Sequence, residues 1–374
     1  MSSTNAITLP HAVSRDAPLR VGIVGANASR GWALSAHLPS IRCFPDDLVI
    51  SAVSARTQAL AEEARVAFSA QQAFGDSLAL VRSPAVDIVL VTVRVPEHRD
   101  LVMAALDAGK HVLCEWPLGR TAAEADEMAA AVPANSHAMI GLQGLSSPAV
   151  RHAQSLIASG ALGALRIMRI TSPSVAWGAE VPPFYAYLQD RQNGATLESI
   201  PGGHTLALIE ALAGRYCEVD ARNSILRKQV RVSGTDEKVE RTCADHMMVL
   251  GQHDGGCVST LEIAGGSSTT PFSLTLEGEN GWIRLFGANR VGVPVDYQAG
   301  PVFLETSWAG VTPLNATVPG LKGASVNVSE SYARFLVDVR SGTRSVPDFD
   351  TARRLARLID GIALASADGR QMIA

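Results

Sequence analysis

The chain has 374 residues, of which 47% are hydrophobic and 18% charged, and its formal net charge is −4. This length is sufficient for two domains, the hydrophobic content excludes wholesale disorder, and the net charge gives no indication of a nucleic-acid-binding surface. Five cysteines without a Cys-x-x-Cys pair indicate free thiols in a reducing compartment, so a cytoplasmic protein is expected.

The first 18 residues lack the apolar core of a signal peptide and predict a loose tail. No run reaches the roughly 18 apolar residues of a membrane helix, so no membrane partner is expected. Apolar runs then predict strands at residues 19–25, 48–54, 86–93, 110–116 and 137–143, and helical patterns lie between them. This alternation is typical of a doubly wound parallel sheet and predicts a Rossmann-type dinucleotide-binding domain over residues 19–146.

From residue 147 the pattern changes to a helix that ends at Gly163, followed by strands joined by short turns. Strands are expected at residues 164–172, 218–226, 245–253, 256–265, 272–280 and 281–287, and two amphipathic helices at 329–342 and 350–369. Residues 147–374 therefore predict an α+β domain with a large, open, mainly antiparallel sheet. A ligand is expected in the crevice between the two domains.

The turn after the first strand is the first candidate cofactor site. Gly25 ends the strand and Gly31 opens the next helix, a placement that lets backbone N–H groups meet a pyrophosphate. The loop is longer than Gly-x-Gly-x-x-Gly, and Asn27 takes the place of the second glycine. The candidate contacts are Gly25, Asn27, Ser29, Arg30, Gly31 and Trp32. The alternative is an ordinary tight turn between strand and helix.

The second strand ends in Ser54, Ala55, Arg56 and Thr57, without the acid that usually contacts the ribose hydroxyls of NAD. A guanidinium at this position favours a 2′-phosphate, so Ser54, Arg56 and Thr57 predict NADP(H) rather than NAD(H). The alternative is that Arg56 is a solvated loop residue.

The segments "VDIVLVTVRVPEHRDLVMAALDAGKHVLCEWPL", "SPAVRHAQSLIASGALGALRIMRI" and "SYARFLVDVRSGTRSVPDFDTARRL" resemble the glucose–fructose oxidoreductase, inositol dehydrogenase and rhizopine catabolism (Gfo/Idh/MocA) family. The resemblance covers about residues 19–369. It implies hydride transfer between a nicotinamide and a sugar or polyol, and a homodimer or homotetramer formed through the C-terminal sheet. It also implies cofactor contacts at Val93, Val95, Pro96, His98, Glu115, Trp116, Pro117 and Gln143.

The chain departs from the family pattern at two reactive positions. Trp116 stands where active members carry a lysine, and Ile200 stands at the aspartate four residues before His204. A branch with a similar pattern is the non-enzymatic galactose-regulon repressor of yeasts, which resembles this chain at "SRGW", "VPEH", "EW", "GGHT" and "RTCADH". The resemblance to that branch implies that an indole is tolerated beside the nicotinamide. Because ligands bind at strand ends in open α/β sheets, Trp116 is expected to stack on the nicotinamide or on a sugar face, and plain packing is the alternative.

Alcohol oxidation needs a base, and His204 is the expected one because imidazole titrates near neutrality. The alternative is a hydrogen-bonded histidine at a helix start. Tyr185 and Tyr187 are expected to assist catalysis, although core packing is an alternative for at least one of them. The predicted substrate contacts are Trp116, Asp190, Asn193 and His204, with solvated loop positions as the alternative for Asp190 and Asn193. No metal-ligand spacing occurs.

Two hypotheses follow from the sequence. The first is an NADP(H)-dependent oxidoreductase that acts on a sugar, polyol or related carbonyl compound. The second is a catalytically silent dinucleotide sensor that binds a protein partner, in which Trp116 and Ile200 mark the lost chemistry. No nucleic-acid partner is expected in either case.

Overall fold

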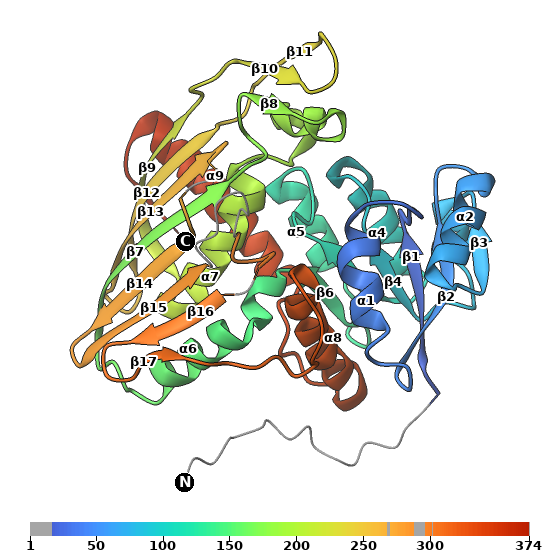
Figure 1. The fold of residues 1–374 in the computed structure, drawn as a ribbon, viewed down its shortest axis with the longest axis horizontal. Helices are drawn as coiled ribbons and strands as arrows, with labels where there is room; N and C mark the ends of the chain where they lie inside the picture. Colours follow the sequence, from blue (N-terminus) through green and yellow to red (C-terminus); the bar gives the residue numbers. More distant parts are fainter. Residues whose placement is uncertain (1–16, 268–269, 288–295, 301, 374) are drawn as a thin grey trace.

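A computed structural model of the chain describes residues 17–267, 270–287, 296–300 and 302–373. Its N-terminal sheet is parallel and has the order β3-β2-β1-β4-β5-β6 (Figure 1). The strands are β1 (Leu19–Val24), β2 (Leu48–Ser54), β3 (Gln72–Phe74), β4 (Ile88–Val91), β5 (His111–Glu115) and β6 (Ala138–Gly141). The helices of this domain are α1 (Leu38–Ile41), α2 (Gln58–Phe68), α3 (Ser77–Val81), α4 (His98–Asp107) and α5 (Ala122–Ala130). This strand order is that of a Rossmann fold.

The second domain is built on a large mixed sheet with the order β17-β16-β15-β14-β7-β13-β12-β9-β18. Its strands are β7 (Leu165–Ser174), β9 (Tyr216–Ser224), β12 (His246–His253), β13 (Val258–Gly265), β14 (Ser273–Gly278), β15 (Gly281–Gly287), β16 (Val302–Thr306), β17 (Gly310–Thr312) and β18 (Gln371–Met372). A small sheet joins β8 (Glu180–Val181), β10 (Gln229–Val232) and β11 (Lys238–Glu240). Within the large sheet only β7 and β13 pair in parallel among the described strands.

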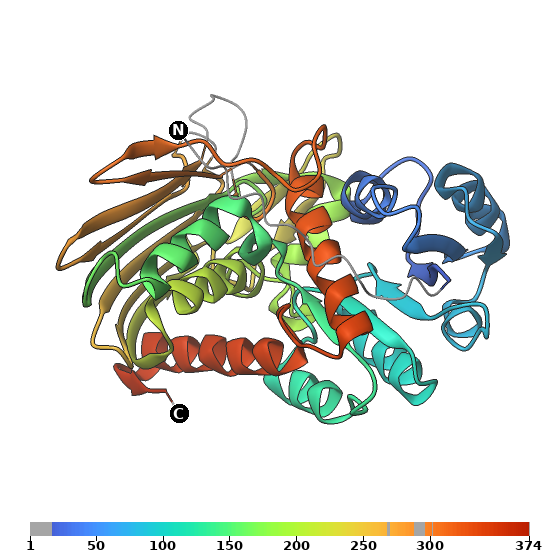
Figure 2. The ribbon, with the colours of Figure 1, turned by 90° about the horizontal axis from the view of Figure 1, so that it is seen from below.

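Helices cover one face of this sheet, as Figure 2 shows. They are α6 (Pro148–Ala158), α7 (Gly203–Ala213) and α9 (Phe349–Asp368). Alternate residues of β12 are buried and exposed: Met247 and Val249 are buried, whereas Met248 and Leu250 are exposed. This period of two is expected for a sheet with one face against a core and the other open.

The helix α8 (Ala324–Ser341) packs on the Rossmann domain, although the sequence placed it with the second domain. Its apolar stripe of Val328, Tyr332, Phe335 and Leu336 is buried in the same core as β1 and α1. This spacing puts the four side chains on one helix face. In both views α8 lies between the two sheets, so it ties the domains together (Figure 2).

The sequence predicted the fold class correctly, together with the alternation that builds the first sheet. It missed β3, which has three residues and no fully buried side chain. It also missed β16, the edge strands β17 and β18, and the small sheet, because strands of two to five residues carry little periodicity. No helix of the described residues is long and apolar enough to cross a membrane.

Candidate functional site

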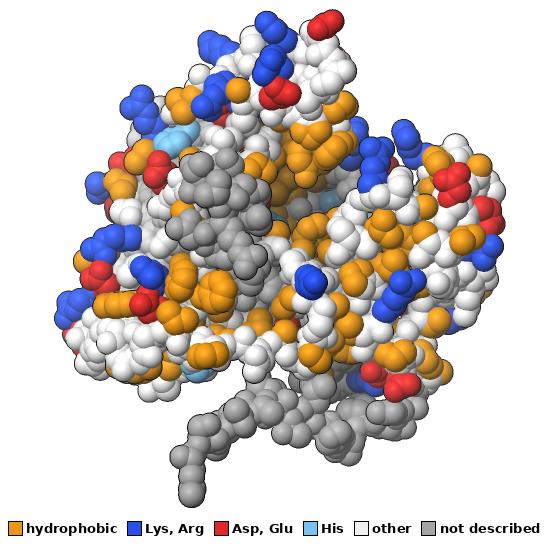
Figure 3. All heavy atoms as spheres, in the orientation of Figure 1, with side chains coloured by type: hydrophobic (Ala, Val, Ile, Leu, Met, Phe, Trp, Pro, Cys, Tyr) orange, Lys and Arg blue, Asp and Glu red, His pale blue; other side chains and the backbone are white. Residues whose placement is uncertain are grey.

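The carboxyl ends of the parallel strands face the second domain, and a hollow separates the two. Figure 3 shows this hollow with hydrophobic side chains on its walls and lysine or arginine side chains at its rim. Ligands of open α/β sheets bind outside the carboxyl ends of the strands. The expected site residues lie on the loops that follow β1, β2, β4, β5 and β6, and on the segment before α7.

The glycine loop is held close to the neighbouring strand end. Gly25 has φ +86°, and a Cβ at this position would lie 2.8 Å from Val93 Cγ1 and 3.1 Å from the Thr92 carbonyl oxygen. Only glycine therefore suits the position. Asn27 Oδ1 accepts hydrogen bonds from the backbone N–H groups of Ser29 and Arg30, at 3.0 and 3.1 Å. Asn27 thus stabilises the longer loop that leads to Gly31. Gly31 has φ +97°, and no described atom beyond its chain neighbours lies within 4 Å of the position that a Cβ would take.

At the end of β2, the side chains of Ser54 and Thr57 bond to other residues of the domain, whereas that of Arg56 forms no hydrogen bond with the described residues. The Ser54 hydroxyl is buried and bonds the Ser77 hydroxyl at 3.0 Å, and Thr57 Oγ1 caps α2 by accepting from Leu60 N–H. Arg56 is exposed and forms no side-chain hydrogen bond or ion pair with the described residues, and the same holds for Arg30. The two guanidinium groups are therefore available for an anionic ligand.

His98 joins the loops after β4 and β5. Its Nδ1 lies 2.9 Å from the Pro117 carbonyl oxygen and its Nε2 lies 3.1 Å from that of Val93. Burial lowers the pKa of His98, so the ring is neutral at pH 7 and donates to one carbonyl at a time. In the same turn Val95 is buried, whereas Pro96 is exposed. His98 therefore fixes the backbone around the predicted cofactor contacts.

Glu115 ends β5 inside a small hydrogen-bonded chain. Its Oε1 lies 2.8 Å from His37 Nε2, and His37 Nδ1 lies 3.0 Å from the Tyr332 hydroxyl of α8. A Cβ on Gly141 would lie 2.9 Å from the Glu115 carboxylate, so glycine at the end of β6 makes room for it. Glu115 therefore connects the Rossmann sheet to the helix that ties the domains together.

Trp116 is buried at the domain junction, with 6% of its surface exposed. Its Nε1–H donates to the Ser199 carbonyl at 2.6 Å. A Cβ on Gly203 would lie 2.4 Å from the indole Cζ2, so the ring lies directly on the first turn of α7. These contacts give the packing role direct support, while stacking of the indole on a nicotinamide stays a prediction.

His204 follows Gly203 and is buried in the interdomain site. Its Nδ1 has no hydrogen-bond partner among the described residues, so it is not the hydrogen-bonded histidine of the alternative interpretation. Burial lowers the pKa of His204 to about 3. The expectation that this ring titrates near neutrality is therefore wrong in this structure, because desolvation disfavours the imidazolium form.

Asp296 is a site residue that the sequence did not indicate. Its Oδ1 is buried without a hydrogen-bond partner among the described residues, and burial raises the pKa of Asp296 to about 7. Burial raises the pKa of Tyr185, and the charge of Asp296 adds to this shift. The hydroxyl of the next residue, Tyr297, donates to the His204 carbonyl. This acid belongs to no spaced motif, and only the fold brings it to the site.

The two tyrosines lie in the 3-10 helix Pro183–Gln189. Tyr185 is exposed, and the Arg94 guanidinium lies 4.5 Å from the ring centroid of Tyr187. Asn193 Nδ2 donates to the Tyr187 carbonyl at 2.8 Å, and Asp190 Oδ1 accepts from Gln192 N–H. Asp190 and Asn193 therefore hold the backbone of the tyrosine segment, and their contact with substrate stays a prediction.

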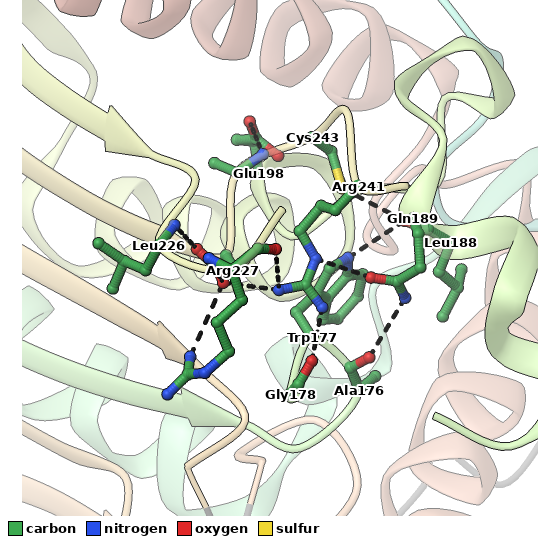
Figure 4. Close-up of polar contacts among 12 residues, drawn as sticks. Ala176, Trp177, Gly178, Leu188, Gln189, Glu198, Leu226, Arg227, Arg241 and Cys243 are labelled. Carbon is green, nitrogen blue, oxygen red and sulfur yellow. Dashed lines mark hydrogen bonds and ion pairs between the residues drawn. The ribbon is translucent and has the colours of Figure 1, made fainter. Parts of the chain in front are cut away.

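A buried arginine anchors this segment to the "RTCADH" stretch (Figure 4). Arg241 Nε donates to Gln189 Oε1 at 2.8 Å, and its Nη2 donates to the Gly178 carbonyl at 2.7 Å. Its Nη1 forms a fully buried ion pair with Asp245 Oδ2 at 2.6 Å. Because Gln189 ends the helix that carries both tyrosines, Arg241 fixes where the tyrosines lie.

Two further buried polar atoms lack partners among the described residues. Gln143 donates through Nε2 to the Gln298 carbonyl, but its buried Oε1 has no partner there, and the same is true of Trp32 Nε1. Buried polar groups are nearly always hydrogen-bonded, so these atoms can bond to water or to a polar ligand. The described residues contain no group of three or more side chains that could hold a metal ion.

Comparisons with known proteins agree with this architecture. The family described as "Oxidoreductase family, NAD-binding Rossmann fold" matches residues 19–142, and the family "Gal80p, C-terminal domain" matches residues 148–287. The galactose/lactose metabolism regulatory protein of Saccharomyces cerevisiae is 28% identical over 75% of this chain and 68% of its own length. The dehydrogenase aclE of Aspergillus oryzae is 26% identical over 94% of this chain and 97% of its own length.

Solved structures share the fold. A super-repressor mutant of Gal80p from Saccharomyces cerevisiae has a TM-score of 0.85 at 21% identity, covering 96% of this chain and 98% of that one. Levoglucosan dehydrogenase in complex with NADH and levoglucosan has a TM-score of 0.82 at 20% identity, covering 96% of this chain and 99% of that one. The fold is therefore common to regulators and to dehydrogenases.

Proposed function

The chain belongs to the Gfo/Idh/MocA oxidoreductase family and has a C-terminal domain of the Gal80p type, and on this basis we propose that it is an NADP(H)-dependent oxidoreductase. The proposed substrate is a sugar, polyol or related carbonyl compound. The observation that carries the proposal is a set of buried polar atoms, which we assign to the interdomain site, that have no partners among the described residues. His204 Nδ1, Asp296 Oδ1 and Gln143 Oε1 are examples, and each would gain a hydrogen bond from a polar ligand.

The residues around β1 fit a dinucleotide. Gly25 turns the chain at the carboxyl end of β1, where a pyrophosphate binds in Rossmann folds, and its own N–H and that of Ala26 hold the turn by donating to the Ser54 carbonyl. Arg56 and Arg30 offer unpaired guanidinium groups, and the end of β2 carries no acid that would repel a 2′-phosphate. This pattern supports NADP(H) over NAD(H).

When bound, the nicotinamide would supply or accept the hydride. His204 is neutral at pH 7, so its Nδ1 can accept a hydrogen bond from a substrate hydroxyl and orient it. Asp296, with a pKa near 7, is suited to take up or release the hydroxyl proton, since acid–base catalysts work best when their pKa is near the working pH. We propose that Tyr185, whose pKa is raised by burial and further by the charge of Asp296, contacts the same substrate.

The relatives and the walls of the site support the proposed substrate class. Levoglucosan dehydrogenase, a structural neighbour, was solved in complexes with levoglucosan and with L-sorbose, both of which are polyhydroxylated. Here the polar groups of the site offer hydrogen bonds, and the aromatic rings of Trp116, Tyr185 and Tyr187 lie on segments beside them. Aromatic faces beside a few polar groups suit a small polyhydroxylated molecule.

A second candidate function is a dinucleotide sensor without turnover. The observation that favours it is the packing of Trp116, which occupies the family lysine position and fixes the domain junction through Ser199 and Gly203. Indole has no acceptor for a proton. The variant Trp116→Lys distinguishes the two functions: higher turnover would support an oxidoreductase pocket, whereas NADPH binding without turnover in both proteins would support the sensor.

We also propose that the chain is cytoplasmic and forms a homodimer or homotetramer through the open face of the large sheet. That face carries exposed hydrophobic side chains, among them Met248, Leu250, Val258, Phe303 and Val311. Contiguous exposed apolar surface marks protein interfaces. Light scattering coupled to gel filtration tests this, and Leu250→Glu should yield monomers if the face is the interface.

A titration with NADPH and NADH tests the cofactor assignment. The Arg56→Gln variant should raise the dissociation constant for NADPH about tenfold or more, because a charge-assisted hydrogen bond is lost, and should leave the value for NADH unchanged. Arg82→Gln is the matched control, since Arg82 is exposed at the end of α3, towards the amino edge of the sheet. Equal loss of NADPH and NADH affinity in Arg56→Gln would refute the 2′-phosphate contact.

A further inference from the structure

A second pocket, with a volume of about 380 Å³, lies between helices of the C-terminal half. Its walls come from α6, the C-terminal part of α7, α8 and the start of α9. Along α7 it is lined by residues from Ala207 to Gly214, whereas His204 begins the same helix at the interdomain site. The pocket is therefore separate from the site proposed for catalysis.

Arginine dominates the charge of this pocket. Arg151, Arg215, Arg334 and Arg354 line it, and the acids that line it are Glu210 and Asp254. Arg354 pairs with Glu210 at 3.1 Å, so this arginine is neutralised. Three guanidinium groups then face one further carboxylate, which leaves an excess of two positive charges in the lining.

The three remaining arginines have no acidic hydrogen-bond partner among the described residues. Arg334 donates to Ser146 Oγ at 3.2 Å and to the Ser345 carbonyl, both neutral oxygens. Arg151 donates to Gln154 Oε1 at 2.9 Å. Arg215 is exposed and makes no side-chain hydrogen bond or ion pair with the described residues.

Two carboxylates that do not line the pocket, those of Asp338 and Glu330, interact electrostatically with Arg334. Both already accept hydrogen bonds from neutral groups. Asp338 accepts hydrogen bonds from Thr343, Ser345 and the Val346 N–H, and Glu330 accepts from Thr317. Burial and the charge of Arg151 lower the pKa of Arg334 to about 10, although Asp338 and Glu330 oppose this shift. The guanidinium groups of Arg151 and Arg334 therefore repel each other, and an anion between them would relieve that repulsion.

We propose that this pocket binds a small molecule that carries a dianionic group, of the phosphate or dicarboxylate type. The two negative charges of such a group match the excess of two positive charges in the pocket lining. Guanidinium groups bind phosphate and carboxylate oxygens through two parallel hydrogen bonds. The volume holds a compact metabolite. Leu145, which lines the pocket, belongs to the turn Gln143–Ser146, so the occupant contacts the same turn as the cofactor-site residue Gln143.

Calorimetric titration of the full chain without NADPH tests the proposal, at constant ionic strength, with inorganic phosphate, glucose 6-phosphate and citrate as probes. The expected result is saturable binding of one anion per chain to at least one probe. Preference for glucose 6-phosphate would identify a phosphate ester as the ligand, preference for phosphate a free ion, and preference for citrate a polycarboxylate. Equally weak, non-saturable binding of all three probes would overturn the proposal.

Variants locate the binding. Arg215→Gln should weaken binding of the preferred probe about tenfold or more, because a charge-assisted hydrogen bond is lost. It should leave the melting temperature unchanged, since Arg215 has no partner to lose. Arg151→Gln provides a second variant on another helix, and Arg82→Gln is the matched control on the Rossmann domain. Affinity that is unchanged in both pocket variants, or equally reduced in the control, would refute the site.

Discussion

The contact between Trp116 and Gly203 can be tested by adding one methyl group. In Gly203→Ala the new Cβ would lie 2.4 Å from the indole Cζ2 and 2.6 Å from Nε1, closer than packed atoms approach. The indole has little room to move because it is buried and its Nε1–H bonds the Ser199 carbonyl. Overpacking of this kind costs about 1–3 kcal/mol.

The backbone of Gly203 is helical, with φ −62° and ψ −40°, so alanine itself is favoured there. Replacing a helical glycine by alanine stabilises by up to about 1 kcal/mol. Gly203→Ala should therefore destabilise the wild-type chain by up to about 2 kcal/mol, yet stabilise a Trp116→Leu chain, in which the ring is gone. The sign of the effect should reverse between the two backgrounds.

The measurement is urea unfolding followed by far-UV circular dichroism, for the four proteins of the double-mutant cycle. A coupling energy of about 1–3 kcal/mol is expected, because residues in contact do not add. The control is Gly361→Ala in α9, whose Cβ would meet only the tip of Ile373. A coupling below about 0.5 kcal/mol for Gly203 would show that the indole does not pack on α7 as described.

Three further changes test the site. His204→Ala should lower turnover by about 10²-fold or more and leave the NADPH dissociation constant within about twofold; unchanged turnover would remove His204 from the reaction. Asp296→Asn should abolish an inflection near pH 7 in the profile of kcat/KM. Because the folded-state pKa of Asp296 is raised, the wild type loses stability as the pH rises from about 4 to 7. Asp296→Asn should therefore raise the melting temperature more at pH 8 than at pH 5. An equal effect at both pH values would refute the raised pKa of Asp296. Arg241→Gln should destabilise by up to about 3–5 kcal/mol, since it removes the buried ion-pair partner of Asp245 and leaves that carboxylate only the half-exposed Arg227 at 3.7 Å. The exposed control Arg231→Gln should change stability by less than about 0.5 kcal/mol in urea unfolding.

The fold could be predicted from local signals that are strong in this chain. Continuous apolar runs such as Ile88–Val91 have no exposed face, and the structure buries all four residues in the parallel sheet. The place of α8 could not be predicted, because an apolar stripe indicates that a helix packs but not against which domain. Strands such as β8 depend on pairing with distant residues for their existence.

The site was predictable where a backbone requirement or a motif leaves a trace in the sequence. Gly25 is an example, since its positive φ and its contact with Val93 require glycine. Asp296 was not predictable, because its burial depends on the fold around it and not on a spaced motif. The low pKa of His204 was equally hidden, since desolvation depends on what covers the ring.

Hydride tracing tests the proposed oxidoreductase function most directly. After saturating NADPH binding is established, with NADH alongside, NADPH deuterated at C4 on one face or the other is supplied with a pool of sugars, ketoses and inososes. Mass spectrometry then locates the deuterium. Transfer of label from one face to a single product is the predicted result and would identify the substrate. Saturable NADPH binding with no label in any product of the pool would contradict hydride transfer and favour the dinucleotide sensor.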